Sequence, residues 1–204
     1  MTQLSEEQMI TKITQWLGTG SINIFGMQFS GKDTQGEHLA HLFNAPLLGG
    51  GDILRNSVIT EDLREALNKG LYVDSKEYIQ IITPYLSKLE FKNKPLILSS
   101  VGRWIGEEEA IIGATQVAKH VIKAVVHLEI EESVAYRRME LADRGRDDDH
   151  HENLKSRINE FRIKTIPVIE VYGSKNLLIT VDGNQSQDKV TSDILKALYK
   201  RATS

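Results

Sequence analysis

One short stretch constrains the fold of this chain most: a turn bracketed by glycines that reads Gly-Met-Gln-Phe-Ser-Gly-Lys-Asp-Thr-Gln over residues 26–35. It follows an apolar run, residues 22–25, and precedes a helical pattern that begins near Lys32. A buried strand, a turn and a helix N-terminus in a row form an anion site from backbone N–H groups and the helix dipole. The sequence therefore predicts a phosphate-binding loop made of Gly26, Met27, Gln28, Phe29, Ser30, Gly31, Lys32, Asp33 and Thr34.

Three side chains of this loop carry chemistry. Lys32 can reach the outer phosphates of a nucleotide, and the hydroxyl of Thr34 can serve a magnesium ion. The hydroxyl usually follows the lysine directly, whereas here Asp33 intervenes. Asp33 is then either a second magnesium ligand or a cap of the helix N-terminus. We therefore expect Mg²⁺, held by Thr34 and Asp33, to accompany a phosphorylated ligand.

The composition limits the classes of protein that this chain can belong to. Its 204 residues suffice for one α/β domain and are too few for two ordinary ones. A formal net charge of −3 and a pI near 6.1 argue against a nucleic-acid partner, which needs a basic face. No apolar stretch approaches the roughly 20 residues that cross a bilayer, and no cysteine is present to form disulfides. We expect a cytoplasmic monomer that binds neither membrane nor nucleic acid.

Short apolar runs alternate with helical patterns along the whole chain. Five of them have the length of a buried strand, namely residues 22–25, 46–48, 95–98, 124–128 and 177–181. Such alternation implies a mainly parallel sheet with right-handed crossovers, and phosphates bind at the carboxyl edge of such a sheet. The predicted fold is a three-layer α/β/α domain of the P-loop NTPase type, with a five-stranded, mainly parallel sheet.

An amphipathic helix precedes the first strand, and we assign residues 1–20 to it. Ser5 to Gln8 forms a capping box, and Met9, Ile13 and Leu17 then recur at helical spacing. Its expected role is to cover one face of the domain, and a helix that binds a partner is the alternative.

The order Gly-Lys-x-Thr-Gln at residues 31–35 resembles the nucleoside monophosphate kinases, adenylate kinase above all. Four further segments extend the likeness. The family motif T-G-D-x-L-R resembles residues 52–55, and its motif G-x-L-V resembles residues 70–73. The family reads D-G-F-P-R at the place of residues 99–103, and its motif G-R-x-D-D resembles residues 144–149. The likeness spans residues 22–199. It implies one kinase domain over residues 21–204, with a helical monophosphate-binding part at about 50–90 and a short lid at about 141–149.

The resemblance also implies which residues act. Lys32, Arg103, Arg137, Arg146 and Arg157 would be catalytic, and the acceptor monophosphate would be bound by Gly51, Asp52, Arg55, Val73, Arg103 and Glu107. Arginine suits these places because its planar group pairs with phosphate through two hydrogen bonds and stays charged. The short lid and the acceptor part would close over both nucleotides and exclude water.

The implied reaction is reversible transfer of the γ-phosphate of ATP to a nucleoside monophosphate, with AMP as the default acceptor and Mg²⁺ as the cofactor. Phe29, Asp33, Gly50, Ser99 and Glu107 depart from the family pattern. The carboxylate of Glu107 would suit the two adjacent donors of guanine, so GMP or another monophosphate is the first alternative. A nucleotide-binding protein of the same fold with weak catalysis, acting as a sensor or interaction module, is the second.

Overall fold

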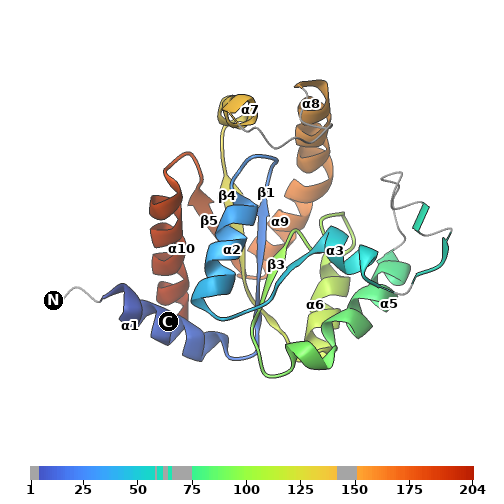
Figure 1. The fold of residues 1–204 in the computed structure, drawn as a ribbon, viewed down its shortest axis with the longest axis vertical. Helices are drawn as coiled ribbons and strands as arrows, with labels where there is room; N and C mark the ends of the chain where they lie inside the picture. The colour runs from blue at the N-terminus through green and yellow to red at the C-terminus, as the bar shows by residue number, and fades with distance from the viewer. Residues whose placement is uncertain (1–4, 58, 62–63, 66–74, 142–150) are drawn as a thin grey trace.

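The computed structural model describes residues 5–57, 59–61, 64–65, 75–141 and 151–204. A five-stranded sheet in the order β2-β3-β1-β4-β5 forms its centre, and its neighbouring strands are parallel (Figure 1). The strands are β1 (Ser21–Gly26), β2 (Leu47–Gly49), β3 (Leu96–Ser99), β4 (Ile122–Glu129) and β5 (Leu178–Asp182). The predicted five-stranded parallel sheet is therefore confirmed.

The central strand β1 places the phosphate-binding loop. All six of its residues are buried, as expected for a strand with neighbours on both sides and helices on both faces. The chain leaves β1 towards β2 on one side of the sheet and leaves β4 towards β5 on the other. The loop after β1 therefore lies at the carboxyl edge, where the direction of the connections reverses and α/β sheets bind ligands.

Three helices cover one face of the sheet: α1 (Glu6–Leu17), α2 (Lys32–Leu42) and α10 (Gln187–Ala202). Ser5 and Gln8 form the capping box of α1, with reciprocal hydrogen bonds of 3.0 and 3.2 Å. Ile13 and Leu17 of α1 are buried in the same apolar cluster as residues of α2 and α10. The N-terminal helix therefore adds to the core through its apolar side and packs against α10.

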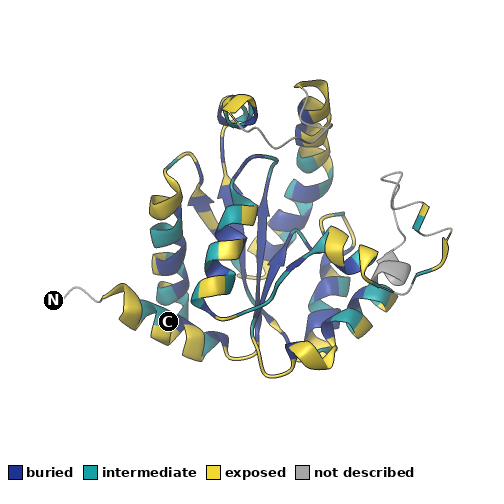
Figure 2. Cartoon of the chain, in the orientation of Figure 1, coloured by how far each residue is buried: buried dark blue, intermediate teal, exposed yellow. Residues whose placement is uncertain are grey.

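The opposite face is covered by α3 (Gly50–Arg55), α5 (Ser75–Leu86), η1 (Leu89–Phe91), α6 (Glu108–Val117) and α9 (Ile166–Ser174). Buried residues run along the strands between the two helical layers, dark blue in Figure 2. Phe25 of β1 and Tyr172 of α9 have ring centroids 6.0 Å apart in this second core. Helices thus cover both faces of the sheet, so a ligand can reach the sheet at the ends of its strands.

Two helices stand beyond the carboxyl edge of the sheet, α7 (Glu132–Leu141) and α8 (His151–Glu160) (Figure 1). A π-helical turn, η2 (Phe161–Thr165), continues α8 into α9. A third apolar cluster joins these helices to the phosphate-binding loop, and it consists of Phe29, Ile130, Ala135, Met139, Leu154 and Ile158. The loop therefore has packed neighbours on the side away from the sheet.

Gly50 and Gly51 form the first turn of α3, directly after β2. Pro167 lies in the first turn of α9, immediately after the π-helical turn that follows α8. Within the described residues, every helix is too short or too polar to cross a bilayer.

Candidate active site

The phosphate-binding loop joins the end of β1 to the start of α2, as the sequence predicts. Two glycines make the turn possible: Gly31 has a φ of +89°, and a Cβ at Gly26 would lie 2.3 Å from Ser30 Oγ. Gly31 is the N-cap of α2, so no capping side chain covers the first turn of that helix. The loop therefore presents a helix N-terminus whose N–H groups and dipole favour an anion.

The acidic residue that follows the lysine bridges two parts of the site. One carboxylate oxygen of Asp33 lies 3.0 Å from Lys32 Nζ, and the other accepts a hydrogen bond of 3.1 Å from Ser99 Oγ at the end of β3. Asp33 lies in the first turn of α2 and the N-cap position belongs to Gly31, so the proposed capping role falls away. Thr34 is the next residue of that turn and is half-buried.

A cavity of about 500 Å³ opens in front of the phosphate loop. Gly26, Gln28 and Lys32 line it from the loop. Arg103 lines it from the segment after β3, and Arg157 lines it from α8. The structure therefore brings three of the predicted catalytic residues to one space, where their positive charge can act on a single phosphoryl group.

Two residues of the cavity wall went unnoticed in the sequence. Lys164 of η2 places its ammonium group 3.8 Å from the ring centroid of Trp104, in the segment after β3. This cation–π contact joins the two sides of the cavity and adds a cation to it. The only sequence signal is that Lys164 follows Arg157 by seven residues, about two helical turns, which places both on one face.

Glu107 is a buried carboxyl group directly before α6, and only 3% of its surface is exposed. Burial raises the pKa of Glu107 to about 7, although the backbone N–H groups of Trp104 and Arg103 and the charge of Arg103 oppose the shift. Its Oε2 accepts from Trp104 N at 3.1 Å. Glu108 is also buried, so only Glu109 of this acidic run is exposed to solvent.

The predicted acceptor segment lies apart from the cavity wall. Arg55 and Asp52 form an exposed ion pair on α3, with 2.6 Å between Nη2 and Oδ1. A Cβ at Gly51 would lie 3.0 Å from the Arg55 guanidinium, so the glycine leaves room for that side chain. Val73 and Arg146 fall outside the described residues. The acceptor-binding and catalytic roles of these residues stay predictions.

Two adjacent arginines on α7 behave differently. Arg137, which the sequence singled out, is exposed. Arg138, which it did not, is half-buried and donates hydrogen bonds to backbone carbonyls of the phosphate loop and of the loop after β5. Burial and the neighbouring charge of Arg137 lower the pKa of Arg138, yet an arginine remains charged at neutral pH. Helical spacing separates the two, because Arg138 follows the apolar Val134 and Ala135 by four and three residues and so lies on the buried side of α7.

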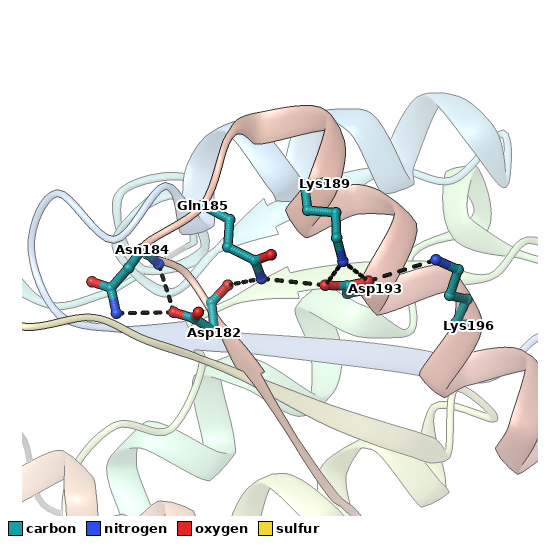
Figure 3. A network of polar contacts seen from close by, with 6 residues as sticks. All are labelled: Asp182, Asn184, Gln185, Lys189, Asp193 and Lys196. Atoms are coloured by element: carbon teal, nitrogen blue, oxygen red, sulfur yellow. Dashed lines mark hydrogen bonds and ion pairs between the residues drawn. The ribbon is translucent and has the colours of Figure 1, made fainter.

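The loop between β5 and α10 is ordered by its own side chains (Figure 3). Asp182 Oδ1 accepts hydrogen bonds of 2.9 Å from the backbone and side-chain nitrogens of Asn184. Gln185 Nε2 donates to Asp182 O and to Asp193 Oδ2 at 2.9 and 3.2 Å. A hydrogen bond from Lys189 lowers the pKa of Asp193. This loop, which Arg138 links to the phosphate loop, therefore has a fixed shape.

Known proteins resemble this chain over most of its length. The family model for adenylate kinase matches residues 24–177. An adenylate kinase of Parasynechococcus marenigrum (strain WH8102) is 30% identical over 174 residues, which cover 83% of this chain and 93% of the relative. One from Methylobacterium radiotolerans is 30% identical over 191 residues, covering 87% and 94%. One from Caldicellulosiruptor bescii is 28% identical over 211 residues, covering 86% and 97%.

Proposed function

Because the chain belongs to the adenylate kinase family and is a phosphotransferase, we propose that it moves the γ-phosphate of ATP reversibly to AMP. One observation carries the proposal. The cavity joins Lys32 of the phosphate loop to Arg103 and Arg157 on the opposite walls. Phosphoryl transfer needs little covalent help from the protein, and it depends on cations around the transferring oxygens and on an acceptor held in line.

Each cation has a separate task in this proposal. Lys32, beside the helix N-terminus, holds the outer phosphates of ATP. Arg103 holds the phosphate of the acceptor, and Arg157 stabilises the charge that develops between the two nucleotides. Arg137 and Arg146 complete this set when the short lid closes.

The residues beside Lys32 fit a magnesium ion. Mg²⁺ in kinases is commonly held by one or two carboxylates together with substrate phosphates. Asp33 supplies one carboxylate, and its hydrogen bond to Ser99 places it beside the end of β3, where the family has an aspartate and this chain does not. Thr34 adds a hydroxyl from the same turn. When bound, the ion would neutralise charge on the phosphates. Asp33 would then supply the carboxylate that the family has at the position of Ser99.

The protonation of Glu107 supports AMP as the acceptor. A carboxyl group with a pKa of about 7 is protonated in about half of the molecules near neutral pH, and the protonated form both donates and accepts a hydrogen bond. Adenine offers one donor, its amino group, and one acceptor, its ring nitrogen N1, to such a partner. Guanine offers two donors and instead suits the ionised form. Gly51, Asp52, Arg55 and Val73 would hold the rest of the acceptor.

The test is an assay of diphosphate formation with Mg²⁺ and ATP against AMP, GMP, CMP, UMP and dTMP. We expect ADP to form from AMP with the highest kcat/KM of the five. A matched variant, Lys32→Met, should abolish turnover while the protein stays folded. Faster turnover with another monophosphate would replace AMP as the acceptor. A folded wild-type protein that turns over none of them would instead support the nucleotide-binding protein with weak catalysis.

A further inference from the structure

Arg138 makes an unusual set of contacts for a helix residue. Its Nη1 donates to Phe29 O at 3.1 Å and to Ser30 O at 3.2 Å, both in the phosphate loop. Its Nη2 donates to Gly183 O at 2.7 Å and to Gln185 O at 3.4 Å, both in the loop between β5 and α10. One guanidinium group on α7 therefore binds two loops that are more than a hundred residues apart in the sequence.

The loop that Arg138 holds contains a strained residue. Phe29 has a φ of +63°, in the left-handed region that bulky side chains rarely adopt. Its ring is only 5% exposed and packs with Ala135, Met139 and Leu154 of α7 and α8. A strained backbone persists only where the surroundings fix it, and here the fixing groups are this apolar cluster and the guanidinium on the Phe29 carbonyl.

The same hydrogen bonds orient the donors that face a phosphate. In a planar trans peptide the C=O of one residue and the N–H of the next point in opposite directions, and the described chain has no cis peptide. Since Ser30 O points to Arg138, the N–H of Gly31 points away from it. Gly31 is the N-cap of α2, so this N–H belongs to the anion site at the helix N-terminus.

We propose that Arg138 is a positioning residue: it holds the phosphate loop in the shape that binds the phosphates of ATP, and it is needed because Phe29 occupies a left-handed position. In this role Arg138 acts through Phe29 and Ser30 rather than by contact with the substrate. The inference rests on the proposed use of ATP as donor, and it is independent of which monophosphate accepts the phosphoryl group.

A matched control lies at the other end of the sheet. Arg201 of α10 also donates to two backbone carbonyls, those of Asn176 and Leu178, at 2.5 and 3.1 Å. These carbonyls precede and begin β5, away from the phosphate loop. If the loss of carbonyl contacts were sufficient by itself, Arg201→Met and Arg138→Met would weaken ATP binding alike. If Arg138 acts through the phosphate loop, only Arg138→Met weakens it.

The first experiment measures ATP binding by titration calorimetry, without any acceptor, together with the melting temperature of each variant. Arg138→Met should weaken ATP binding about 10-fold or more, the scale of lost hydrogen bonds from a charged group. Arg138→Lys, which can restore part of the set, should weaken it less. Arg201→Met should leave ATP affinity within about twofold of the wild type. Should Arg138→Met fail to fold, the comparison of Arg138→Lys with Arg201→Lys decides.

The second experiment tests the link to Phe29. In a Phe29→Gly background the loop no longer needs support for a strained residue, so Arg138→Met should weaken ATP binding by less than about threefold there. An Arg138→Met protein that binds ATP as well as the wild type would overturn the positioning role, and equal losses in both backgrounds would overturn the link to Phe29. A wild type that binds ATP yet phosphorylates no monophosphate would refute the proposed acceptor reaction and leave this test intact.

Discussion

Hydrogen bonds between loops fix the proposed donor side of the molecule, whereas the proposed acceptor side carries an exposed ion pair on the short helix α3. On the donor side, Gly183 N donates to Glu129 O at 2.7 Å and Glu131 N donates to Asn184 Oδ1 at 3.1 Å. On α3, by contrast, the side chains of Arg55 and Asp52 are 69% and 62% exposed. The proposed donor site is thus held by hydrogen bonds within the protein, whereas the side chains proposed to bind the acceptor monophosphate are exposed to solvent.

Among the arginines, the largest expected effect comes from Arg157, which lines the cavity from α8. Arg157→Ala should lower kcat about 100-fold, the scale of a lost group that stabilises developing charge, with little change in ATP affinity. Arg146→Ala should act in the same way. Arg162→Ala is the control, since Arg162 is paired with Glu132 and lies five residues further along. An unchanged kcat with a raised KM would reassign Arg157 to substrate binding.

The donor side can be weakened at the proposed magnesium site. Asp33→Asn keeps the size of the side chain and removes its charge, so the Mg²⁺ concentration for half-maximal rate should rise about 10-fold. Asp188→Asn provides a matched control, because Asp188 also lies in the first turn of a helix, α10. Equal magnesium dependence of Asp33→Asn and the wild type would rule out the ligand role.

The acceptor side should respond in binding and not in stability. Arg55→Ala should raise the KM for AMP about 10-fold, because a charge-assisted contact to phosphate is lost. The melting temperature should barely move, since an exposed ion pair contributes little to folding. Arg64→Ala, in the same part of the chain and paired with Glu61 at 3.8 Å, is the control. A similar rise in the KM for ATP would contradict the assignment of Arg55 to the acceptor.

The smallest expected effect is on the choice of base. As pH rises through about 7, Glu107 loses its proton and its ability to donate, so the preference for AMP over GMP should fall about threefold. This is far below the roughly 10⁴-fold discrimination that polar groups can reach. In Glu107→Gln the preference should not change between pH 6 and pH 8, values chosen to lie about one unit either side of that pKa.

The stability of the fold provides a second measurement of the same group. The pKa of Glu107 is higher in the folded protein than in the unfolded chain, so the folded state retains a proton that the unfolded state has lost. The free energy of unfolding should therefore decrease as pH rises from about 4.5 to about 7. Glu107→Gln should remove this part of the decrease, and an identical pH dependence in the variant would show that Glu107 titrates normally.

Local patterns in the sequence were enough to predict the parallel sheet and the phosphate loop. The five strands are short apolar runs, and the loop is defined by Gly26, Gly31 and Lys32. His127 follows the same pattern, because it stands within an apolar run: it is buried on β4, and burial lowers its pKa. Each of these features depends on residues that are close together in the chain, so periodicity and spacing reveal them.

Contacts between distant segments could not be predicted in the same way. Arg138 holds the phosphate loop from α7, and Lys164 meets Trp104 across the cavity. Both depend on how helices are rotated and docked, which no single stretch of sequence specifies. The raised pKa of Glu107 has the same origin. The assembled fold buries the carboxyl group and removes water from it, and the local sequence alone does not show this.

The π-helical turn η2 sets the rotational phase between α8 and α9. Five residues, Phe161–Thr165, occupy a wider turn than an α-helix would use, which amounts to about one residue more than a regular helix would hold. Each residue of an α-helix turns the chain by about 100°. Deleting one residue within η2 would therefore restore a regular helix and rotate α8 by about that angle relative to α9, which packs on the sheet. Arg157 would then face away from the cavity, although its own sequence neighbourhood had not changed.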